Sequence, residues 1–198
     1  AGEVAIDGRL VAFSTPKDAA DAGIAVVHQH FNLVPTITVA ENLWLGELLP
    51  RRFGLVDWPR VHDRAREVLQ RLGLDIPTTA EIGNLRPDQL AMISIAKAVS
   101  GDARIIILDE PTNALLPDEA ERLFVQMRAL AAKGHSFLYI SHRLAEVFEI
   151  ADRVTVLRDG RNAGVFDRQD MDRRAVVEAI VGRKGATAER KTFSHTRP

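Results

Sequence analysis

Cysteine is absent from the 198-residue chain. Its absence excludes disulfides, thiolate metal sites and a cysteine nucleophile. No apolar run approaches the ~20 residues that a membrane span needs, and no signal peptide is visible, so we expect any membrane role to be peripheral. Neither sign of charge is in excess, because 26 basic residues face 27 acidic ones. Nothing in that balance indicates nucleic acid as a partner.

The chain does contain an alternation of apolar strands and amphipathic helices, and its apolar share of 46% can fill a sizeable core. Apolar runs at 24–27, 104–111 and 136–140 predict three buried strands, and the segments between them are typical of helices. Strands that alternate with helices predict an α/β fold with a mostly parallel sheet. Residues 35–100 show no convincing strand, so we interpret them as a helical insertion between two core strands.

Turn residues mark further boundaries. The Asp-Gly pairs at 7–8 and 159–160 each predict a hairpin turn. Amphipathic helices are predicted to begin at Trp58 and Pro117, each with a proline in the first turn. From Arg183 onward the chain is polar and basic without periodicity, which indicates a linker or tail.

Two carboxylates, Asp109 and Glu110, stand at the end of the strand predicted over 104–111. Pro111 ends that strand because proline cannot donate a hydrogen bond to a sheet ladder. Open α/β folds bind their ligands at the carboxyl edge of the sheet. There the first acid can hold a divalent metal on a polyphosphate, and the second can polarise a water. The alternative is a buried strand that ends in a solvated acidic turn.

Polar residues follow the other two predicted strands as well, Gln29 after the first and His142 after the last. Either one alone is more simply explained as a capping or hydrogen-bonded group. The carboxyl ends of parallel strands share one edge, however, so these two residues and the two acids can converge on one ligand. An amide can order water, and a neutral imidazole can donate to a developing phosphate charge. The joint placement therefore favours a nucleotide hydrolase.

Several segments, in order, resemble the ATP-binding cassette of ABC transporters, specifically the first cassette of the tandem proteins that energise sugar and nucleoside importers. The resemblance covers nearly the whole chain. Its blocks are VVHQHFNLVP at 26–35, IIILDEPT at 105–112, YISHRL at 139–144, DRVTVLRDG at 152–160 and VGRK at 181–184. They resemble the family's Q-loop, Walker B strand, switch-histidine segment, following hairpin and domain end. The resemblance implies a P-loop NTPase (ABC ATPase) core with a mostly parallel sheet, an inserted helical subdomain, and a missing N-terminal part of the core.

By that resemblance the chain would bind ATP and Mg²⁺ and act as an ATP hydrolase in a translocase. Asp109 would bind Mg²⁺, and Glu110 would polarise the attacking water. His142 would contact the γ-phosphate, so Glu110 and His142 are the expected catalytic residues. Gln29 would sense the metal and the water, and its loop would link the site to the permease.

The resemblance also implies partners, namely a second ABC cassette, an integral membrane permease and, indirectly, a solute-binding protein. No nucleic acid is expected. The chain would lie peripherally on the cytoplasmic face of the cell membrane and support import of a sugar or nucleoside-like solute. Phe31, Leu33 and Trp44 are candidate contacts with the permease, and the alternative for each is an ordinary core position.

The same comparison divides the chain into four parts. Residues 1–33 would be a partial ATPase core up to the Q-loop, and residues 34–100 the helical subdomain that ends in a signature-like helix. Residues 101–182 would be the ATPase core with Walker B and the switch histidine, and residues 183–198 the linker or tail.

The chain departs from the family first at its start. No phosphate loop of the form G-x-x-x-x-G-K-[ST] occurs in the 198 residues. The resemblance implies that these residues start beyond the family's loop and its helix, either because an upstream segment was removed or because it is missing here. In the family that loop supplies most phosphate contacts. We therefore expect these residues by themselves to bind nucleotide weakly or not at all and to be inactive, and we expect apolar surface to be exposed around the lost helix.

The second departure is the family's L-S-G-G-Q signature, which is here Leu85-Arg86-Pro87-Asp88-Gln89. The serine hydroxyl and glycine amides that would grip the γ-phosphate of the partner's ATP are gone. Pro87 has no amide proton, and Asp88 would repel a polyphosphate by roughly 1 kcal/mol or more at short range. The alternative is a plain helix entry with proline in its first turn.

The degenerate signature would weaken the site built on the partner's phosphate loop, whereas the site that contains Glu110 would use the partner's own signature. We therefore expect an asymmetric tandem pair with one competent site. Two alternatives stay open: a soluble ABC-type ATPase without a permease, acting in translation or DNA repair, and a non-catalytic cassette fragment that serves as a binding scaffold. The near-neutral charge and the transporter-like Q-loop segment argue against the first.

Overall fold

The computed structural model describes residues 3–28, 32–101 and 103–182. The chain forms two compact units, residues 1–142 and residues 143–198. The parallel strands and the acids at their ends belong to the first unit. Within the residues that the structure describes, no helix is both long and apolar enough to cross a membrane.

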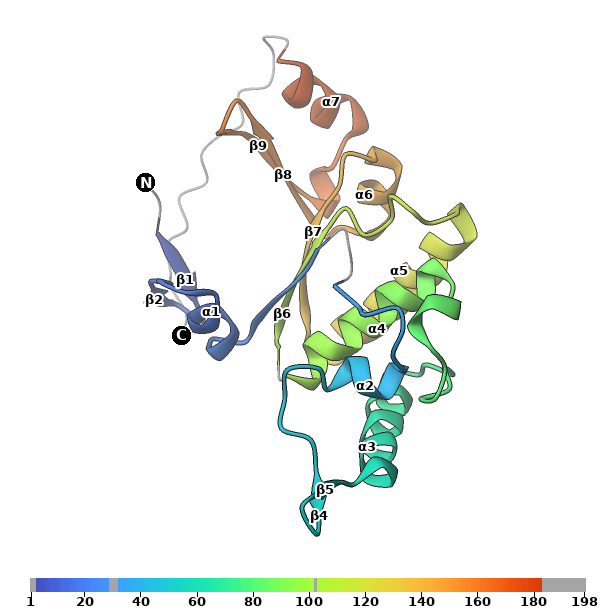
Figure 1. Cartoon of the computed structure of the whole chain (residues 1–198). Helices are drawn as coiled ribbons and strands as arrows, with labels where there is room; N and C mark the ends of the chain where they lie inside the picture. The colour runs from blue at the N-terminus through green and yellow to red at the C-terminus, as the bar shows by residue number, and fades with distance from the viewer. Residues whose placement is uncertain (1–2, 29–31, 102, 183–198) are drawn as a thin grey trace. The chain divides into compact units, whose positions relative to one another are not determined.

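The first unit combines a three-stranded parallel sheet with two short hairpins and five α-helices among its described residues (Figure 1). Its strands are β1 (Val4–Ile6), β2 (Arg9–Val11), β3 (Ile24–Val27), β4 (Arg51–Arg52), β5 (Leu55–Val56), β6 (Ile105–Asp109) and β7 (Ser136–Ile140). Its α-helices are α1 (Pro16–Asp21), α2 (Val39–Leu43), α3 (Trp58–Arg71), α4 (Pro87–Ser100) and α5 (Pro117–Ala131). The predicted alternation of strands and helices is confirmed.

The three predicted core strands form one sheet in the order β3, β6, β7, and both neighbouring pairs are parallel. Its register places Val27 opposite Leu108, and Asp109 opposite Ile140. The helix α4 packs on β3, and α5 packs on β7. Because all three strands run the same way, their carboxyl ends meet at one edge, as the sequence predicts.

The two faces of this sheet differ in burial. Ile106 and Leu108 of β6 are fully buried on the face that the helices cover. Val26, Leu138 and Ile140 lie on the opposite face, because side chains alternate along a strand, and they are 47%, 54% and 45% exposed. Apolar side chains are therefore exposed at this face of the sheet, and their link to a lost helix stays a prediction.

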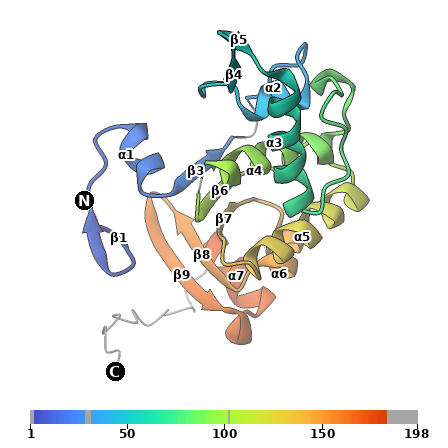
Figure 2. The same cartoon turned by 90° about the horizontal axis from the view of Figure 1, so that it is seen from below.

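The helical insertion packs α2 against both α3 and α4 (Figure 2). Asp57 precedes α3, and its side chain accepts a hydrogen bond from the Arg60 amide at 3.3 Å, which caps the helix. The apolar stripe predicted for α3 is buried: Val61, Ala65, Val68, Leu69 and Leu72. Trp44, next to α2, is 6% exposed and lies beneath the Arg64 guanidinium, 4.2 Å from the ring centroid. Trp44 is thus a core residue rather than a surface contact.

The insertion also contains a hairpin that the sequence does not predict. The strands β4 and β5 pair antiparallel around Phe53 and Gly54. Both turn residues have positive φ, 53° and 83°, which is the geometry of a two-residue type I′ turn. The prediction that 35–100 lacks strands is therefore wrong at this point. Each strand has only two residues, too few for an alternating pattern to stand out.

The second unit is an antiparallel hairpin with two helices among its described residues: α6 (Leu144–Ile150), β8 (Arg153–Arg158), β9 (Arg161–Asp167) and α7 (Arg173–Val181). The predicted turn at 159–160 is confirmed, with φ of 51° and 70°. Val156, Val176 and Ala179 form its buried core. This unit is the hairpin-and-helix block that resembles the end of the family's domain.

The boundary between the compact units falls after His142, inside the part predicted as one block over 101–182. The predicted four-part division follows functional segments rather than compact units, and it stays a prediction. The tail predicted from Arg183 lies outside the described residues.

Candidate active site at the carboxyl edge of the parallel sheet

The strand β6 carries Asp109 and Glu110 to the edge of the sheet. The Glu110 amide donates a hydrogen bond to the Ile140 carbonyl at 2.9 Å, which extends the pairing with β7 by one step. Glu110 itself has a φ of 47°, in the left-handed region that a long side chain seldom occupies. Backbone strain of this kind is concentrated at functional sites. The strand end is therefore sharply turned at the second acid.

Glu110 meets His142 across the ends of β6 and β7. The Nδ1 atom of His142 lies 2.9 Å from Oε1 of Glu110. The two side chains are 67% and 32% exposed, so the pair is open to a ligand. The predicted convergence at one edge is confirmed for these two residues.

The second carboxylate oxygen of Glu110 also has a partner, because Nδ2 of Asn113 donates a hydrogen bond to Oε2. The pKa of Glu110 lies below its usual range, and the hydrogen bond with His142 is the largest cause, followed by the one from Asn113. Glu110 is therefore ionised at neutral pH and fixed in direction. Sequence reasoning did not single out Asn113; the only signal was its place in the turn after Pro111.

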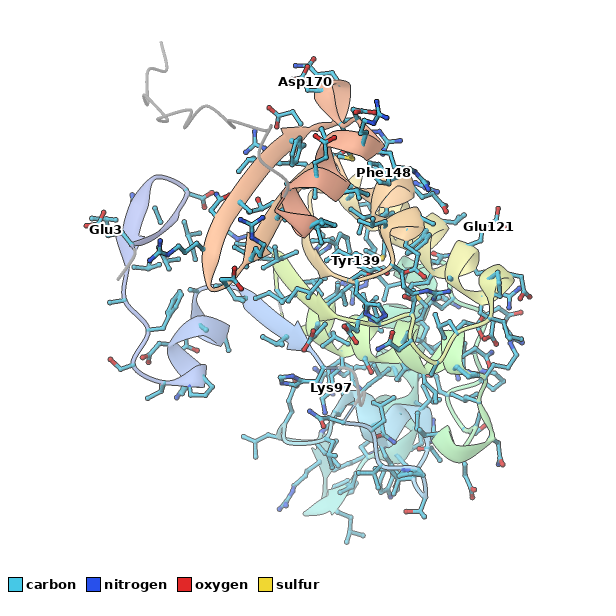
Figure 3. The ribbon with its side chains drawn as sticks, turned by 90° about the horizontal axis from the view of Figure 1, so that it is seen from above. Glu3, Lys97, Glu121, Tyr139, Phe148 and Asp170 are labelled. Carbon is cyan, nitrogen blue, oxygen red and sulfur yellow. The ribbon has the colours of Figure 1, made fainter. Side chains whose placement is uncertain are left out.

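A contact between two hydroxyl groups, of Thr112 and Tyr139, supports this turn. Thr112 is 1% exposed, and its Oγ1 lies 3.1 Å from the hydroxyl of Tyr139. Tyr139, labelled in Figure 3, belongs to β7 and meets Phe124 of α5 edge to face, with ring centroids 6.0 Å apart. The contact joins the turn that carries Glu110 to the sheet and to α5. Neither hydroxyl residue was predicted to belong to the site.

Asp109 is half-buried, and alternation along β6 places it on the uncovered face of the sheet. In nucleotide sites Mg²⁺ is held by one or two carboxylates together with phosphate oxygens and waters. Asp109 and Glu110 offer oxygens of that kind. No group of three or more His, Cys, Asp or Glu side chains that could hold a metal occurs among the described residues. The carboxylate oxygens of Asp109 and Glu110 suit a metal that arrives with a phosphate ligand.

Gln29, the remaining predicted site residue, lies outside the described residues, as does Phe31. The segment that follows them is held by Asn42 of α2, which is fully buried. Its Oδ1 accepts a hydrogen bond from the Val34 amide at 2.8 Å, and its Nδ2 donates to the carbonyls of Val34 and Thr38 at 3.0 and 3.1 Å. Asn42 thus clamps the segment after Gln29 onto the helical insertion.

The segment that resembles the signature, Leu85–Gln89, forms the entry to α4. The helix begins at Pro87, so the proline lies in its first turn. The Arg86 amide donates to Oε1 of Gln89 at 3.1 Å, which closes the first turn. These contacts agree with the simple helix entry considered above. Whether the segment faces a partner's ATP stays a prediction.

Asp88 is 5% exposed and is paired with two arginines. Arg86 donates to both carboxylate oxygens, at 3.0 and 3.1 Å, and Nε of Arg122 in α5 donates to Oδ2 at 3.0 Å. The predicted repulsion of polyphosphate did not take these two arginines into account, and it stays a prediction. The charge of Asp88 is neutralised inside the protein, where it links α4 to α5.

We expect Asp88→Asn to lower the free energy of unfolding by about 1–2 kcal/mol, since two charge-assisted hydrogen bonds weaken while the half-exposed arginines regain water. Burial raises the pKa of Asp88 and is the largest single effect, but the hydrogen bonds from Arg86 and Arg122 together outweigh it, so the pKa lies below its ordinary 3.8. This stabilisation is therefore present above pH 3.8 and is lost as the pH falls through the lower folded-state pKa.

Urea unfolding at neutral and acid pH measures this effect. The wild type should lose stability toward acid more steeply than Asp88→Asn. The matched control is Asp118→Asn, whose carboxylate is 67% exposed and bonds to Arg122 at 3.1 Å; we expect it to cost less than about 0.5 kcal/mol. Equal losses for the two variants would contradict the proposed difference between a buried and an exposed partner.

A parallel α/β sheet that gathers carboxylates and a histidine at its carboxyl edge belongs to the class of open α/β proteins that bind ligands at that edge. A family model described as ABC transporter matches residues 1–113. The chain belongs to the ABC transporter family, and its fold is the P-loop NTPase fold of the ABC ATPases.

Among curated proteins, the chain is 44% identical to the ribose import ATP-binding protein RbsA of Bacillus licheniformis over 92% of its own length and 37% of that protein. It is 42% identical to the arabinose import ATP-binding protein AraG of Pectobacterium atrosepticum, over 92% of the chain and 36% of that protein. The chain therefore spans little more than a third of the length of these relatives.

Solved structures agree on the fold. A nucleotide-free ATP-binding cassette from an ABC transporter superposes with a TM-score of 0.75 at 25% identity, covering 92% of this chain and 78% of the other. The ADP conformation of MJ1267, an ATP-binding cassette of an ABC transporter, superposes with a TM-score of 0.72 over 89% and 75%. At 24% identity the second likeness establishes the fold alone.

Proposed function

We propose that the chain is the ATP-binding and ATP-hydrolysing part of an ABC importer, and that it couples Mg-ATP hydrolysis to uptake of a solute through a membrane permease. The Glu110–His142 contact carries the proposal, because it sets an ionised carboxylate beside an imidazole at the ligand-binding edge of the sheet. The names of the curated relatives, which specify ribose and arabinose import, support a sugar within the wider class of sugar and nucleoside-like solutes.

In this proposal Asp109 is the protein ligand of Mg²⁺, which would shield the charge of the phosphates when bound. Glu110 orients and polarises the attacking water. Both of its oxygens now bind side chains, His142 and Asn113, so a water has to replace one of those hydrogen bonds. His142 is 67% exposed, and once released it can donate to the γ-phosphate. One movement of His142 would thus free the base and supply a phosphate contact.

The coupling to the permease rests on the segment after Gln29. We propose that Gln29 senses the metal and the water, and that the clamp at Asn42 transmits this to the helical insertion. The partners would be the permease, a second ABC cassette and, through the permease, a solute-binding protein. The chain would then act as a peripheral protein at the cytoplasmic face of the membrane.

We further propose that the chain is the first cassette of a tandem pair and that the phosphate loop belongs to a part of the whole protein beyond these 198 residues. The share of the relatives that the chain covers, 37% and 36%, supports this because it leaves room for a second cassette. The entry to α4 would face the second cassette's ATP without glycine amides to bind it. The pair would therefore have one competent site and one degenerate site.

The test is ATP hydrolysis by the whole protein, reconstituted with its permease in vesicles. We expect hydrolysis that requires Mg²⁺ and that rises when the permease and the loaded solute-binding protein are present. The 198 residues alone should bind Mg-ATP more weakly than micromolar in a titration. If the permease left the rate of hydrolysis unchanged and the protein co-purified with ribosomes or DNA, the importer function would be contradicted. A soluble ATPase would then be supported.

A further inference from the structure

The hairpin of β4 and β5 and the segment just before it present exposed apolar side chains, which we define as the apolar tip: Leu48, Phe53 and Leu55. These side chains are 96%, 92% and 76% exposed. A backbone hydrogen bond closes the base of the hairpin, since the Asp57 amide donates to the Pro50 carbonyl at 2.9 Å. The fold therefore holds three large apolar side chains in water at one point, where none of them contributes to the core.

The turn at this tip departs from the chain's own pattern. The other two hairpins of the described residues turn on Asp-Gly pairs at 7–8 and 159–160, again with positive φ at both turn residues. Asp or Asn is favoured at the first position of such a turn because its short polar side chain tolerates the left-handed region. Phe53 occupies that position with a φ of 53°. A bulky aromatic residue there works against folding, so its presence points to a role outside folding.

Charge separates this hairpin tip from the others too. Arg51 and Arg52 make up β4, and no acidic residue occurs between Leu48 and Val56. The Arg52 guanidinium lies 5.4 Å from the centre of the Phe53 ring. The other hairpins carry an aspartate at the turn instead. Guanidinium groups beside exposed apolar side chains match a surface that is anionic outside and apolar just beneath.

We propose that the apolar tip inserts into an anionic phospholipid surface, with Phe53 and the leucines at the level of the acyl chains and the arginines on the phosphates. A lipid surface fits better than a protein partner because a specific protein interface buries about 800 Å² on each side, far more than a hairpin of two-residue strands offers. The inference rests on the proposed position at the membrane but does not involve the nucleotide site.

The experiment is co-sedimentation of the whole protein, without its permease, with vesicles of phosphatidylcholine and with vesicles of phosphatidylcholine and phosphatidylglycerol in equal amounts. We expect binding to the anionic vesicles only, weakened by salt. Phe53→Asn should reduce it about tenfold, because the aromatic anchor is lost. Replacing Arg51 or Arg52 by Ser should reduce it about fivefold each.

Phe53→Asn separates this role from folding, because an Asn-Gly turn should leave the unfolding midpoint unchanged or raised. The matched controls are Leu10→Asn, which removes a side chain 69% exposed on β2, and Arg161→Ser on β9. Both should bind vesicles as the wild type does. The depth of insertion is measured by the fluorescence of a tryptophan introduced as Phe53→Trp. Lipids brominated on their acyl chains should quench this fluorescence, and they should not quench that of Leu10→Trp.

Equal loss of vesicle binding in Leu10→Asn would overturn the proposal. A wild-type protein that does not bind anionic vesicles would also overturn the proposal. If Phe53→Asn in that case reduced co-purification with the permease, the apolar tip would be a protein contact instead. Glu110→Gln should bind vesicles normally. Failure of the lipid contact is thereby distinguished from failure of the proposed ATPase.

Discussion

Glu110→Gln is expected to lower Mg-ATP hydrolysis by the whole protein at least ~100-fold, with ATP affinity changed by less than about threefold. Glutamine keeps the length of the side chain and can still accept a hydrogen bond from Asn113. It loses the negative charge that polarises water. Phosphate release at saturating ATP, together with a nucleotide titration, separates the loss of chemistry from a loss of binding.

The matched control is Glu121→Gln, since Glu121 is an exposed acid that points away from α5 (Figure 3). It should hydrolyse ATP at the wild-type rate. Glu110→Asp adds a second comparison, because a carboxylate shortened by one carbon keeps its charge but withdraws from His142. Hydrolysis that survives Glu110→Gln would refute the assignment of Glu110 as the water-polarising group.

The pH dependence of hydrolysis gives an independent check on the same residue. The hydrogen bonds from His142 and Asn113 keep the pKa of Glu110 below its ordinary 4.5. Glu110 therefore stays ionised as the pH falls from 7 to 5, and the contribution of its contacts to stability persists until the pH drops through the lower folded-state value. If the hydrolysis rate fell between pH 7 and 5 in the wild type but not in Glu110→Gln, Glu110 would be titrating in that range. That result would contradict the lowered pKa of Glu110.

The sequence was sufficient for the sheet because its strands carry an unambiguous pattern. Each of β3, β6 and β7 is an apolar run followed by polar residues, and the parallel topology that helices between strands predict brings the strand ends together. The contact between Glu110 and His142 follows from that topology alone. The ion pairs of the Asp88 side chain could not be predicted from the sequence. They depend on where α5 places Arg122, which is decided by packing between elements that are distant in the chain.

The contacts of single turn side chains could not be predicted from the sequence either. Asn113 and Thr112 lie in a turn of ordinary turn residues, and only the folded structure shows that Asn113 binds Glu110 and Thr112 contacts Tyr139. The β4–β5 hairpin was missed for a related reason, since Phe53 replaces the residue type that announces such a turn. In each case the local sequence pattern was too weak to predict the contact or the turn that the structure shows.

Asn42→Ala is expected to lower the free energy of unfolding by about 3 kcal/mol, and the unfolding midpoint by about 10 °C. Alanine leaves the Val34 amide and the carbonyls of Val34 and Thr38 without the side-chain partner they now have, and Asn42 itself is fully buried. A buried polar group without a partner costs about 1–3 kcal/mol. Thermal and urea unfolding of the whole protein measure the loss.

Asn42→Asp distinguishes the clamp from simple packing, because it keeps the volume and the acceptor for the Val34 amide but loses the donor. The ionised aspartate faces two carbonyls and should destabilise at neutral pH, whereas its protonated form donates again, so the deficit should shrink toward acid. Asn84→Ala, at an exposed position, is the matched control and should change stability by less than about 0.5 kcal/mol. If Asn42→Ala were equally mild, the segment after Gln29 would be held by other contacts, and the proposed route from the nucleotide site to the permease would lose its anchor.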